Sequence, residues 1–569
     1  MLNKNRDKAE QLKKLPPPIG SSSYIEAATK CYYVDKTLLV RDIIDNEHLV
    51  TLFARPRRFG KTLNMDMLRV FFEKNIEDTS VYFKDKLIWQ CGNKYTKHQG
   101  KYPVIYLTLK DTKFSSWDSI YKNILNLMQK EFKRHYELAT SQKLNNDDLE
   151  NYIKYKSEKL PPDESFDALA ILSELLFKHY NEKPIIIIDE YDIPIQQGYI
   201  HGFYNQIVEF TRNMYSATFK DNNNLFKGFL TGILRVSKES IFSGFNNPKT
   251  NTVLDDQYSQ YFGFTPNEVK AMARYYNAED KYLEICEWYD GYQFGNTEIF
   301  NPWSVVNYFD SGCQVAPYWT NTSNNDIIRE LLSYSNNSVN EKLQKLVLGN
   351  SITTTIDTNI VYPNLKTSQD ALFSFLLLTG YLKIKNRKLL FDEYEYELTI
   401  PNKEVLKAYR KEILSMLESN IDKNIIQSIA AMLLSGNIDN LQSSLETILL
   451  QSVSFHDATE GFYHGLMFAL CLIATGSYEV TSNRESGLGR YDILMMPKKK
   501  NLPGIIIEIK TAKKATLTNL KTVAKKAIKQ IKDKQYDTVM INNNIKTVYE
   551  YGVAFAGKNV AIEKDIVNY

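Results

Sequence analysis

Residues 52–63 read LFARPRRFGKTL and match most of a phosphate-binding loop. The G-x-x-x-x-G-K-[ST] pattern lies between a strand and a helix, because consecutive backbone N–H groups wrap the phosphates and the lysine reaches the terminal ones. Gly60, Lys61 and Thr62 fit, and the apolar run 48–54 predicts the preceding strand. Arg55 stands at the first glycine position, where a Cβ must tolerate the dihedral angles of the loop. The alternative is a basic, solvated turn.

Two adjacent carboxylates complement this loop. The stretch 183–192, KPIIIIDEYD, places Asp189 and Glu190 at the end of a strand of four isoleucines. We expect Asp189 to hold the shell of a magnesium ion together with Thr62, and Glu190 to polarise the attacking water. The alternative is an ordinary strand end with exposed acids.

Four further residues have open roles. In FKGFLTGILR, Thr231 is a candidate sensor beside the γ-phosphate, with Arg235 nearby. Plain β-propensity and a solvent-facing arginine explain the same pattern equally well. Arg57 and Arg58 are candidates for phosphate contact, for ion pairs that fix the loop, or for binding a partner.

The order of predicted elements divides the chain. Residues 1–25 look like a flexible charged tail. From 26 to 235, apolar runs (HLVTLFA, YPVIYLTL, PIIIIDE and FKGFLTGIL) alternate with helical stretches at 61–73, 116–139, 165–180 and 203–218, which predicts an α/β fold with a parallel sheet. Residues 236–425 are mostly helical, with a capping box at Thr265 and a helix–hairpin–helix layout compatible with a winged-helix module. Residues 426–569 form a third region, with helices and strands.

A second constellation lies in this last region. Asp492 is expected in one strand, and GIIIEIK places Glu508 and Lys510 on one face of the next, because side chains alternate along a strand. Two acids and a lysine then converge. Carboxylates suit magnesium, and the lysine can orient water or stabilise phosphoryl charge, which is the chemistry of phosphodiester hydrolysis. Such spacing also arises by chance in many strands.

The runs YYVDKTLLVRDI, LFARPRRFGKTLNMDML, IIIIDEYDIPI and WYDGYQFG…FNPWSV resemble the AAA-ATPase-like proteins that carry a carboxy-terminal PD-(D/E)XK nuclease domain. The resemblance covers nearly the whole chain after the tail, and SNRESGLGRYDIL also resembles the family. It implies a P-loop NTPase module and a restriction-endonuclease-like α/β domain. An arginine at position 55 is usual in that family. The resemblance makes Glu460 a further candidate metal ligand and gives Gln530 a place in the site. For His464 we expect only a surface pair with Glu460.

The distribution of charge is independent evidence for a nucleic-acid partner. Between 498 and 534 there are twelve lysines against Glu508 and Asp533, whereas the net charge of the chain is only +3. Such a density attracts phosphate backbones without base specificity. We expect a surface that binds nucleic acid on these residues: Lys513, Lys514, Lys525, Lys526, Lys529 and Gln530. DNA is the expected partner, although nothing in the sequence separates DNA from RNA. A solvated face of an amphipathic helix at 513–533 is the alternative.

The remaining features set the cellular context. The five cysteines include no C-x-x-C pair, so neither a disulfide framework nor a zinc site is indicated. No apolar run approaches the ~20 residues that span a bilayer, so we expect no membrane contact and a cytoplasmic protein, with a homo-oligomer left open. The sequence thus predicts an ATP-binding and ATP-hydrolysing module, with ATP and Mg²⁺ as cofactors, that controls a metal-dependent nuclease. The alternative is a nucleotide-dependent switch or scaffold that binds nucleic acid or protein without cutting.

Overall fold

The computed structural model describes residues 14–74, 77–220, 222–235, 248–320, 337–347, 349–420, 423–452, 460–482, 484–512 and 516–569. The chain divides into two compact units. The first unit comprises Met1–Asn324 and Thr353–Glu404, and the second comprises Asn325–Ile352 and Val405–Tyr569. The division into a tail and three domains predicted from the sequence is finer than these two units and stays a prediction.

The first unit is built on a parallel sheet of five strands in the order β2-β3-β4-β1-β5. The strands are β1 (Val50–Ala54), β2 (Val104–Thr108), β3 (Ile185–Asp189), β4 (Lys227–Gly232) and β5 (Pro248–Asn251). The first four confirm the predicted apolar runs. The sequence pattern missed β5, because PKTN is a polar edge strand without the alternation or apolar run that marks a strand.

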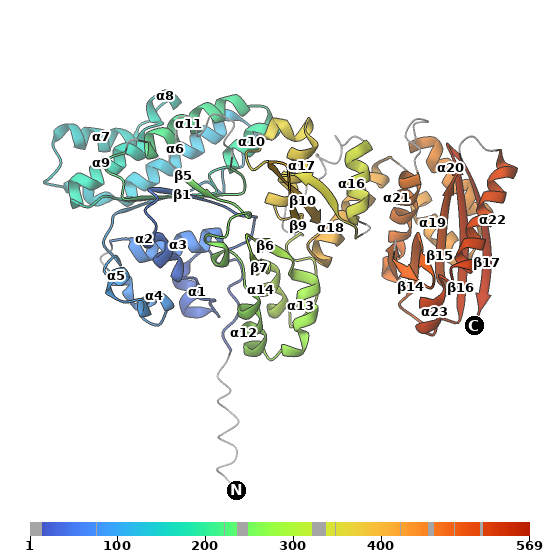
Figure 1. Cartoon of the computed structure of the whole chain (residues 1–569). Coiled ribbons are helices and arrows are strands. Elements are labelled where there is room, and N and C mark those ends of the chain that lie inside the picture. Colours follow the sequence, from blue (N-terminus) through green and yellow to red (C-terminus); the bar gives the residue numbers. More distant parts are fainter. Residues whose placement is uncertain are drawn as a thin grey trace, which may run out of the picture. The chain divides into compact units, whose positions relative to one another are not determined.

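Helices cover both faces of this sheet, with α6, α7, α9 and α11 on one side and α1 to α5 on the other (Figure 1). They are α1 (Tyr24–Lys30), α2 (Leu38–Asp45), α3 (Lys61–Phe72), α4 (Leu87–Gln90), α5 (Asn93–Thr96), α6 (Trp117–Arg134), α7 (Asn146–Ser157), α8 (Pro162–Ser165), α9 (Ala168–Tyr180), α10 (Ile193–His201) and α11 (Tyr204–Phe219). The predicted α/β fold is confirmed, and α3, α6, α9 and α11 are the four predicted helices. Such layers bury both faces of the sheet, which is why the isoleucines of β3 are all buried.

The rest of the first unit is mainly helical. It contains α12 (Pro266–Tyr276), α13 (Tyr282–Tyr289), α14 (Pro302–Asp310), α17 (Gln369–Leu378) and the short strand pair β6 (Tyr292–Phe294) and β7 (Thr297–Ile299). The predicted capping box starts α12: Thr265 accepts from the N–H of Glu268, and Glu268 accepts from the N–H of Thr265. The predicted helix–hairpin–helix is formed by α17, β9 (Lys383–Leu390), β10 (Glu393–Thr399) and α18 (Lys403–Asn420), with β8 (Ile352–Thr355) beside β10.

The second unit has a mixed sheet in the order β11-β14-β15-β16-β17, in which only β15 and β16 run parallel. Its strands are β11 (Tyr478–Ser482), β14 (Ile493–Pro497), β15 (Gly504–Thr511), β16 (Thr547–Ala556) and β17 (Asn559–Asn568), with the small pair β12 (Glu485–Ser486) and β13 (Gly489–Arg490). Its helices besides α18 are α16 (Asn337–Val347), α19 (Lys423–Ser435), α20 (Ile438–Ser452), α21 (Glu460–Cys471), α22 (Leu517–Asp533) and α23 (Thr538–Asn542).

Helix α22 lies close against β16. A Cβ at Gly552 would stand 2.1 Å from the carbonyl oxygen of Ala524, so only glycine allows this approach. The apolar face of α22 buries Leu520, Ala524, Ala527 and Ile531. Leu517, which the helical pattern assigns to the same face, is 48% exposed because it lies in the first turn, beyond the packed part of the helix.

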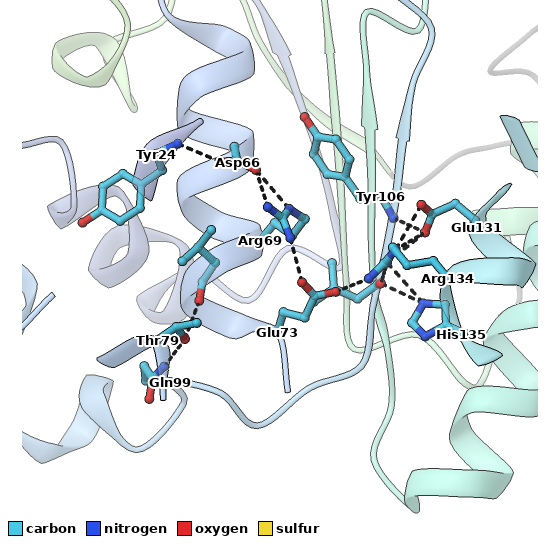
Figure 2. A network of polar contacts seen from close by, with 12 residues as sticks. Tyr24, Asp66, Arg69, Glu73, Thr79, Gln99, Tyr106, Glu131, Arg134 and His135 are labelled. Carbon is cyan, nitrogen blue, oxygen red and sulfur yellow. Dashed lines mark hydrogen bonds and ion pairs between the residues drawn. The ribbon is translucent and has the colours of Figure 1, made fainter. Parts of the chain in front are cut away.

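A chain of ion pairs and hydrogen bonds holds α3 in place (Figure 2). Asp66 accepts the backbone N–H of Tyr24 at 2.7 Å and an ion pair from Arg69 at 2.7 Å. Arg69 also pairs with Glu73 at 2.9 Å, and Glu73 pairs with Arg134 of α6. The network therefore joins α1, α3 and α6. It also places Tyr24, a residue that the sequence assigned to the tail, at the start of a helix with a fully buried side chain.

We expect Glu73→Ala to destabilise the first unit, because it leaves Arg69 and Arg134 without their shared carboxylate. Breaking a buried pair costs about 3–5 kcal/mol, and the partly exposed arginines make the low end, about 3 kcal/mol, appropriate here. Urea unfolding followed by far-UV circular dichroism measures the effect. The exposed pair of Lys30 and Glu26 supplies the control, and Glu26→Ala should cost less than about 1 kcal/mol. Equal unfolding midpoints for the two variants would contradict the expectation.

Candidate nucleotide and nuclease sites

The carboxyl ends of β1, β3 and β4 meet at one edge of the first sheet. Strand β4 lies between β1 and β3, and the parallel register pairs Phe53 with Thr231. Asp189 ends β3 at the same edge, and the loop of residues 55–60 leaves β1 there. Parallel sheets bind ligands outside the carboxyl ends of their strands. The topology alone thus brings the loop, Asp189 and Thr231 together.

The backbone of the loop turns sharply before α3. Gly60 is the N-cap of α3 and has φ +82°. A Cβ there would meet nothing within 4 Å, so glycine is favoured by the left-handed backbone and not by a lack of space. Arg58 also has a positive φ, +68°. The first-turn N–H groups of α3 have no intrahelical partner and lie at the positive end of the helix dipole. This geometry suits an anion at the start of α3.

Arg55 occupies the first glycine position without strain, because its φ is negative. Its side chain is fully buried, with the guanidinium carbon 5.5 Å from the ring centre of Phe262 and 5.1 Å from that of Phe294. One nitrogen, Nη1, donates to the carbonyl of Asn251 in β5 at 2.8 Å. Burial lowers the pKa of Arg55 to about 9. The arginine thus anchors the loop to the core through cation–π contacts and its hydrogen bond to β5.

Lys61 follows the loop as the first residue of α3. Its Nζ donates to the carbonyls of Arg55 at 3.2 Å and Pro56 at 3.1 Å, and lies 3.5 Å from a carboxylate oxygen of Glu190. Lys61 is almost fully buried, yet it lines the cavity at the loop. The ammonium group is therefore held at the loop and beside the acid expected to position water.

Asp189 accepts hydrogen bonds from Thr62 and Thr231, the two threonines predicted from the sequence. The hydroxyl of Thr62 donates to Oδ2 at 2.8 Å, and the hydroxyl of Thr231 donates to Oδ1. The Thr231 oxygen in turn accepts the backbone N–H of Glu190 at 3.1 Å. One buried carboxylate thus links α3, β3 and β4, and the structure brings these predicted residues together.

Negative charge is concentrated beside Lys61. Burial raises the pKa of Asp189, and the neighbouring Glu190 raises it further. Burial likewise raises the pKa of Asp192 to about 6. Glu190 has φ +57°, and its Oε2 is buried without a hydrogen-bond partner. Asp189 and Glu190 together carry more negative charge than Lys61 balances, so this pair fits the implied magnesium ion, which needs only one or two carboxylates.

A cavity of about 400 Å³ opens at the loop. This volume lies in the range of small-molecule sites. Its cationic lining consists of Lys36, Arg57, Arg58, Lys61, Lys110 and Lys113, and its aromatic lining of Tyr33, Phe59, Tyr261, Phe264 and Trp303. Cations beside the loop suit phosphates, and aromatic rings suit a base.

The two arginines of the loop contact other residues. Arg57 donates to Oε1 of Gln196 at 2.7 Å, and the guanidinium of Arg58 lies 4.1 Å from the ring centre of Trp303. Both still line the cavity. Arg235 lies three residues beyond the end of β4, at the end of a described stretch. The sequence did not single out Trp303, although it lies in the aromatic run FNPWSV.

In the second unit, Asp492 and Glu508 are neighbours across two strands. Antiparallel pairing of Ile493 with Ile507 sets Asp492 opposite Glu508. Asp492 itself lies in a bend just before β14 rather than in a strand, because its side chain accepts the N–H of Ile509 at 2.7 Å in place of ladder pairing. The prediction of a strand at Asp492 is therefore wrong by one residue, and its meeting with Glu508 is confirmed.

Lys510 lies on the same face of β15 as Glu508, as the alternation predicted. Its Nζ is 2.8 Å from Oε1 of Glu508, and Gln530 of α22 donates to the same oxygen. Glu508 is 2% exposed, and its Oε2 is buried without a hydrogen-bond partner. Burial raises the pKa of Glu508 to about 7, with a further rise from Asp492. A cation between the two carboxylates would remove this cost.

The number of carboxylates in the second unit limits which metal ion they could hold. Within the described ranges, no group of three or more His, Cys, Asp or Glu side chains is arranged to hold a metal ion. Glu460 begins α21, but its side chain lies outside what the structure describes. The described pair, Asp492 and Glu508, fits Mg²⁺, which keeps several waters and needs only one or two carboxylates.

His464 departs from the expected surface pair. It is buried, and its Nε2 lies 3.1 Å from the carbonyl oxygen of Asp492 and 3.1 Å from the hydroxyl of Ser482. The expectation of a surface residue was wrong, because α21 packs its inner face against the sheet where β14 begins. The i, i+4 spacing from Glu460 did not reveal this, although the apolar residues around His464 in GFYHGLMFALC do point to a buried helix face.

The lysines of α22 divide into paired and open groups. Lys525, Lys526 and Lys529 are exposed, whereas Lys532 pairs with Asp565. Lys513 and Lys514 lie outside the described residues. Gln530, expected at nucleic acid, donates to Glu508 and lies 3.2 Å from the hydroxyl of Tyr536. The exposed lysines and the carboxylate pair therefore belong to neighbouring elements, α22 and β15.

Comparisons with known proteins bear on the fold of both units. Over 540 residues the chain is 24% identical to a protein of Azotobacter chroococcum mcd 1 described as an uncharacterized protein in the vnfD 5′ region, covering 92% of this chain and 93% of that protein. Among the described residues, no helix has the length and apolar character needed to cross a membrane. Residues 18–242 match the family of predicted AAA-ATPases, and residues 458–565 match the PD-(D/E)XK nuclease superfamily. The first match contains β1 to β4 of the parallel sheet and the second contains β11 to β16 of the mixed sheet, so each match agrees with the fold of its unit.

Proposed function

We propose that the protein binds and hydrolyses ATP in its first unit, cleaves nucleic acid with Mg²⁺ in its second unit, and uses the nucleotide to control cleavage. The observation that carries the proposal is that both units join buried carboxylates to a lysine. Lys61 lies 3.5 Å from Glu190, and Lys510 lies 2.8 Å from Glu508. Each site also keeps a buried carboxylate oxygen without a hydrogen-bond partner.

In the ATP site, Lys61 and the first-turn N–H groups of α3 bind the β and γ phosphates. Arg57 and Arg58 line the same cavity and add positive charge. Thr62 and Asp189, whose hydroxyl and Oδ2 are 2.8 Å apart, would hold the magnesium ion of the nucleotide. Glu190 positions the attacking water. The backbone N–H of Glu190 donates to the hydroxyl oxygen of Thr231 at 3.1 Å, which fixes Glu190 in place.

In the nuclease site, Asp492 and Glu508 would hold Mg²⁺, with Glu460 as a third candidate ligand. Mg²⁺ held there would neutralise charge on the scissile phosphate and activate water. Lys510 orients that water or stabilises the charge that develops on the phosphate. The N–H of Ile509 fixes the Asp492 carboxylate at 2.7 Å, and Gln530 fixes Glu508.

The substrate is nucleic acid, with DNA as the expected form. Exposed lysines of α22, namely Lys525, Lys526 and Lys529, attract its phosphates on the helix whose Gln530 reaches Glu508. Lys513 and Lys514 extend the same run of charge in the sequence. The described lysines of this surface supply charge for phosphates rather than contacts to base edges, so cleavage is expected to be weakly sequence-specific.

Substitutions in the ATP site should separate binding from hydrolysis. Lys61→Ala should remove measurable ATP binding, because the lysine supplies the charge at the β and γ phosphates. Glu190→Gln should bind ATP normally and hydrolyse it about 100-fold more slowly, since a positioned base contributes 10²–10⁴-fold. Calorimetric titration and phosphate release measure these effects, with Lys122→Ala, an exposed lysine of α6, as control. Unchanged affinity in Lys61→Ala would exclude the phosphate-loop role.

The nuclease site yields a second set of expectations. Asp492→Ala and Glu508→Ala should abolish cleavage at every Mg²⁺ concentration, while Lys510→Ala should keep Mg²⁺ binding and lower the rate of the chemical step. Binding of nucleic acid should survive in all three variants. Gel assays with labelled DNA and RNA, with Asp533→Ala as control, measure cleavage. Cutting that persists unchanged in the Asp492 and Glu508 variants would point to a contaminating nuclease, and no cutting by the wild type would favour the scaffold alternative.

The lysine surface can be tested by its response to salt. Replacing Lys525, Lys526 and Lys529 with glutamine should flatten the plot of log affinity against log salt by roughly one unit for each phosphate that the helix no longer neutralises. Fluorescence anisotropy with a labelled duplex, in the catalytically silent Asp492→Ala background, measures the slope. Replacing three exposed lysines of α6, Lys122, Lys130 and Lys133, serves as the control. A wild-type slope in the α22 variant would show that this helix is only a solvated surface.

A further inference from the structure

The phosphate-binding loop is held from outside the sheet by the residues that follow it in the first unit. The carbonyl of Arg57, in the middle of the loop, accepts the indole Nε1–H of Trp319 at 3.0 Å. Trp319 is almost fully buried, and 262 residues separate the two partners in the chain. The ring of Tyr381 packs on Trp319 with centroids 4.9 Å apart. The indole is therefore fixed in one position beside the loop.

Trp319 is linked in turn to Glu404. The backbone N–H of Trp319 donates to Oε1 of Glu404 at 2.6 Å, and the hydroxyl of Ser304 donates to Oε2 at 2.7 Å. Glu404 is fully buried. Hydrogen bonds to a buried carboxylate are short and strong, so this link resists rearrangement.

Glu404 is the second residue of α18, which spans Lys403–Asn420. The first unit ends at Glu404, and the second unit resumes at Val405. The helix is thus continuous in the chain from the residue that receives Trp319 to the unit that carries Asp492 and Glu508. A displacement of Glu404 moves the start of a hydrogen-bonded helix.

The peptide unit between Arg57 and Arg58 links a change in the loop to the hydrogen bond of Trp319. A peptide unit is planar, so its carbonyl and its N–H turn together. Trp319 holds the carbonyl of Arg57, while the N–H of Arg58 belongs to the stretch that wraps phosphates in such loops. Arg58 also has the strained φ of +68°. If nucleotide binding turns this N–H, the carbonyl of Arg57 turns with it, and the hydrogen bond from Trp319 must then shift or break.

We propose that Trp319 and Glu404 are positioning residues that transmit the nucleotide state of the loop to α18. The inference rests on the proposed function, because it names the route by which ATP controls the second unit. Coupling of this kind needs a contiguous physical chain whose arrangement differs between states. The described contacts supply that chain from Arg57 through Trp319 to Glu404.

Hydrogen–deuterium exchange of the whole chain, with and without a non-hydrolysable ATP analogue and Mg²⁺, tests the proposal. In the wild type, the analogue should slow exchange in the loop peptide and change exchange in the α18 peptide. Trp319→Phe removes the indole N–H and keeps a ring. It should keep the effect at the loop and reduce the effect at α18 by about fivefold, the equivalent of one hydrogen bond. Glu404→Gln replaces one acceptor oxygen by an amide and should act in the same direction.

Matched controls come from the same region. Trp288→Phe and Glu284→Gln change the same residue types in α13, where Trp288 packs on the core of α12–α14 and Glu284 accepts from Tyr308. Both should respond to the analogue like the wild type. An α18 response in Trp319→Phe and Glu404→Gln equal to that of the wild type would overturn the proposal. Loss of protection at the loop in both variants would also overturn it, since the contacts would then only build the loop.

The same experiment separates failure of the inference from failure of the proposed function. If the analogue does not protect the loop peptide of the wild type, ATP binding is excluded. The proposed function and the inference then both fail. Protection at the wild-type loop without any change at α18 would overturn the inference alone. These outcomes do not depend on nuclease activity, so they hold even if cleavage needs an additional activator.

Discussion

The carboxylate of Asp189 is the interaction on which the first unit depends. It ends a strand of four buried isoleucines and receives the hydroxyls of Thr62 and Thr231, so one side chain ties α3, β3 and β4 at the carboxyl edge of the sheet. A charge in this position is costly, and burial raises its pKa. The two threonine hydroxyls and the nearby Lys61 offset part of this cost, which makes the carboxylate a structural junction of this edge of the sheet.

The two units share a single physical arrangement although their sheets differ. In the first, Glu190 lies beside Lys61; in the second, Glu508 lies beside Lys510. In both, the second oxygen of the glutamate is buried without a hydrogen-bond partner. Buried polar atoms are normally satisfied, so these two oxygens have room for a donor or a cation, as do the unpartnered carboxyl oxygens of Asp290 and Glu550. The lysine beside each glutamate, together with the family matches, distinguishes the two proposed sites.

Patterns of local sequence predicted most of the scaffold. The apolar runs indicated β1 to β4, and Thr265 with Glu268 indicated the start of α12, because strand burial and helix capping depend on residues near in the chain. The meeting of Asp492, Glu508 and Lys510 was also predictable, since alternation and one antiparallel turn suffice. Family resemblance added Glu460 and Gln530, which spacing alone would not select.

Contacts between distant residues escaped prediction. The sequence cannot show that Arg55 has a negative φ or that Phe262 and Phe294 enclose it. The links from Trp319 to Arg57 and Glu404 join residues 262 and 85 positions apart. The burial of His464 depends on the packing of α21 rather than on its spacing from Glu460. Each of these is a tertiary effect that overrides the local pattern.

The central claim is that ATP bound at Lys61 changes cleavage by the second unit, and one measurement tests it most directly. The rate of nucleic-acid cleavage is followed at fixed Mg²⁺ over a series of ATP concentrations, for the wild type and for Lys61→Ala. The account predicts that saturating ATP changes the wild-type rate by at least about fivefold, a typical coupling between sites, and leaves the Lys61→Ala rate unchanged. A wild-type rate independent of ATP, or an equal response in Lys61→Ala, would contradict it.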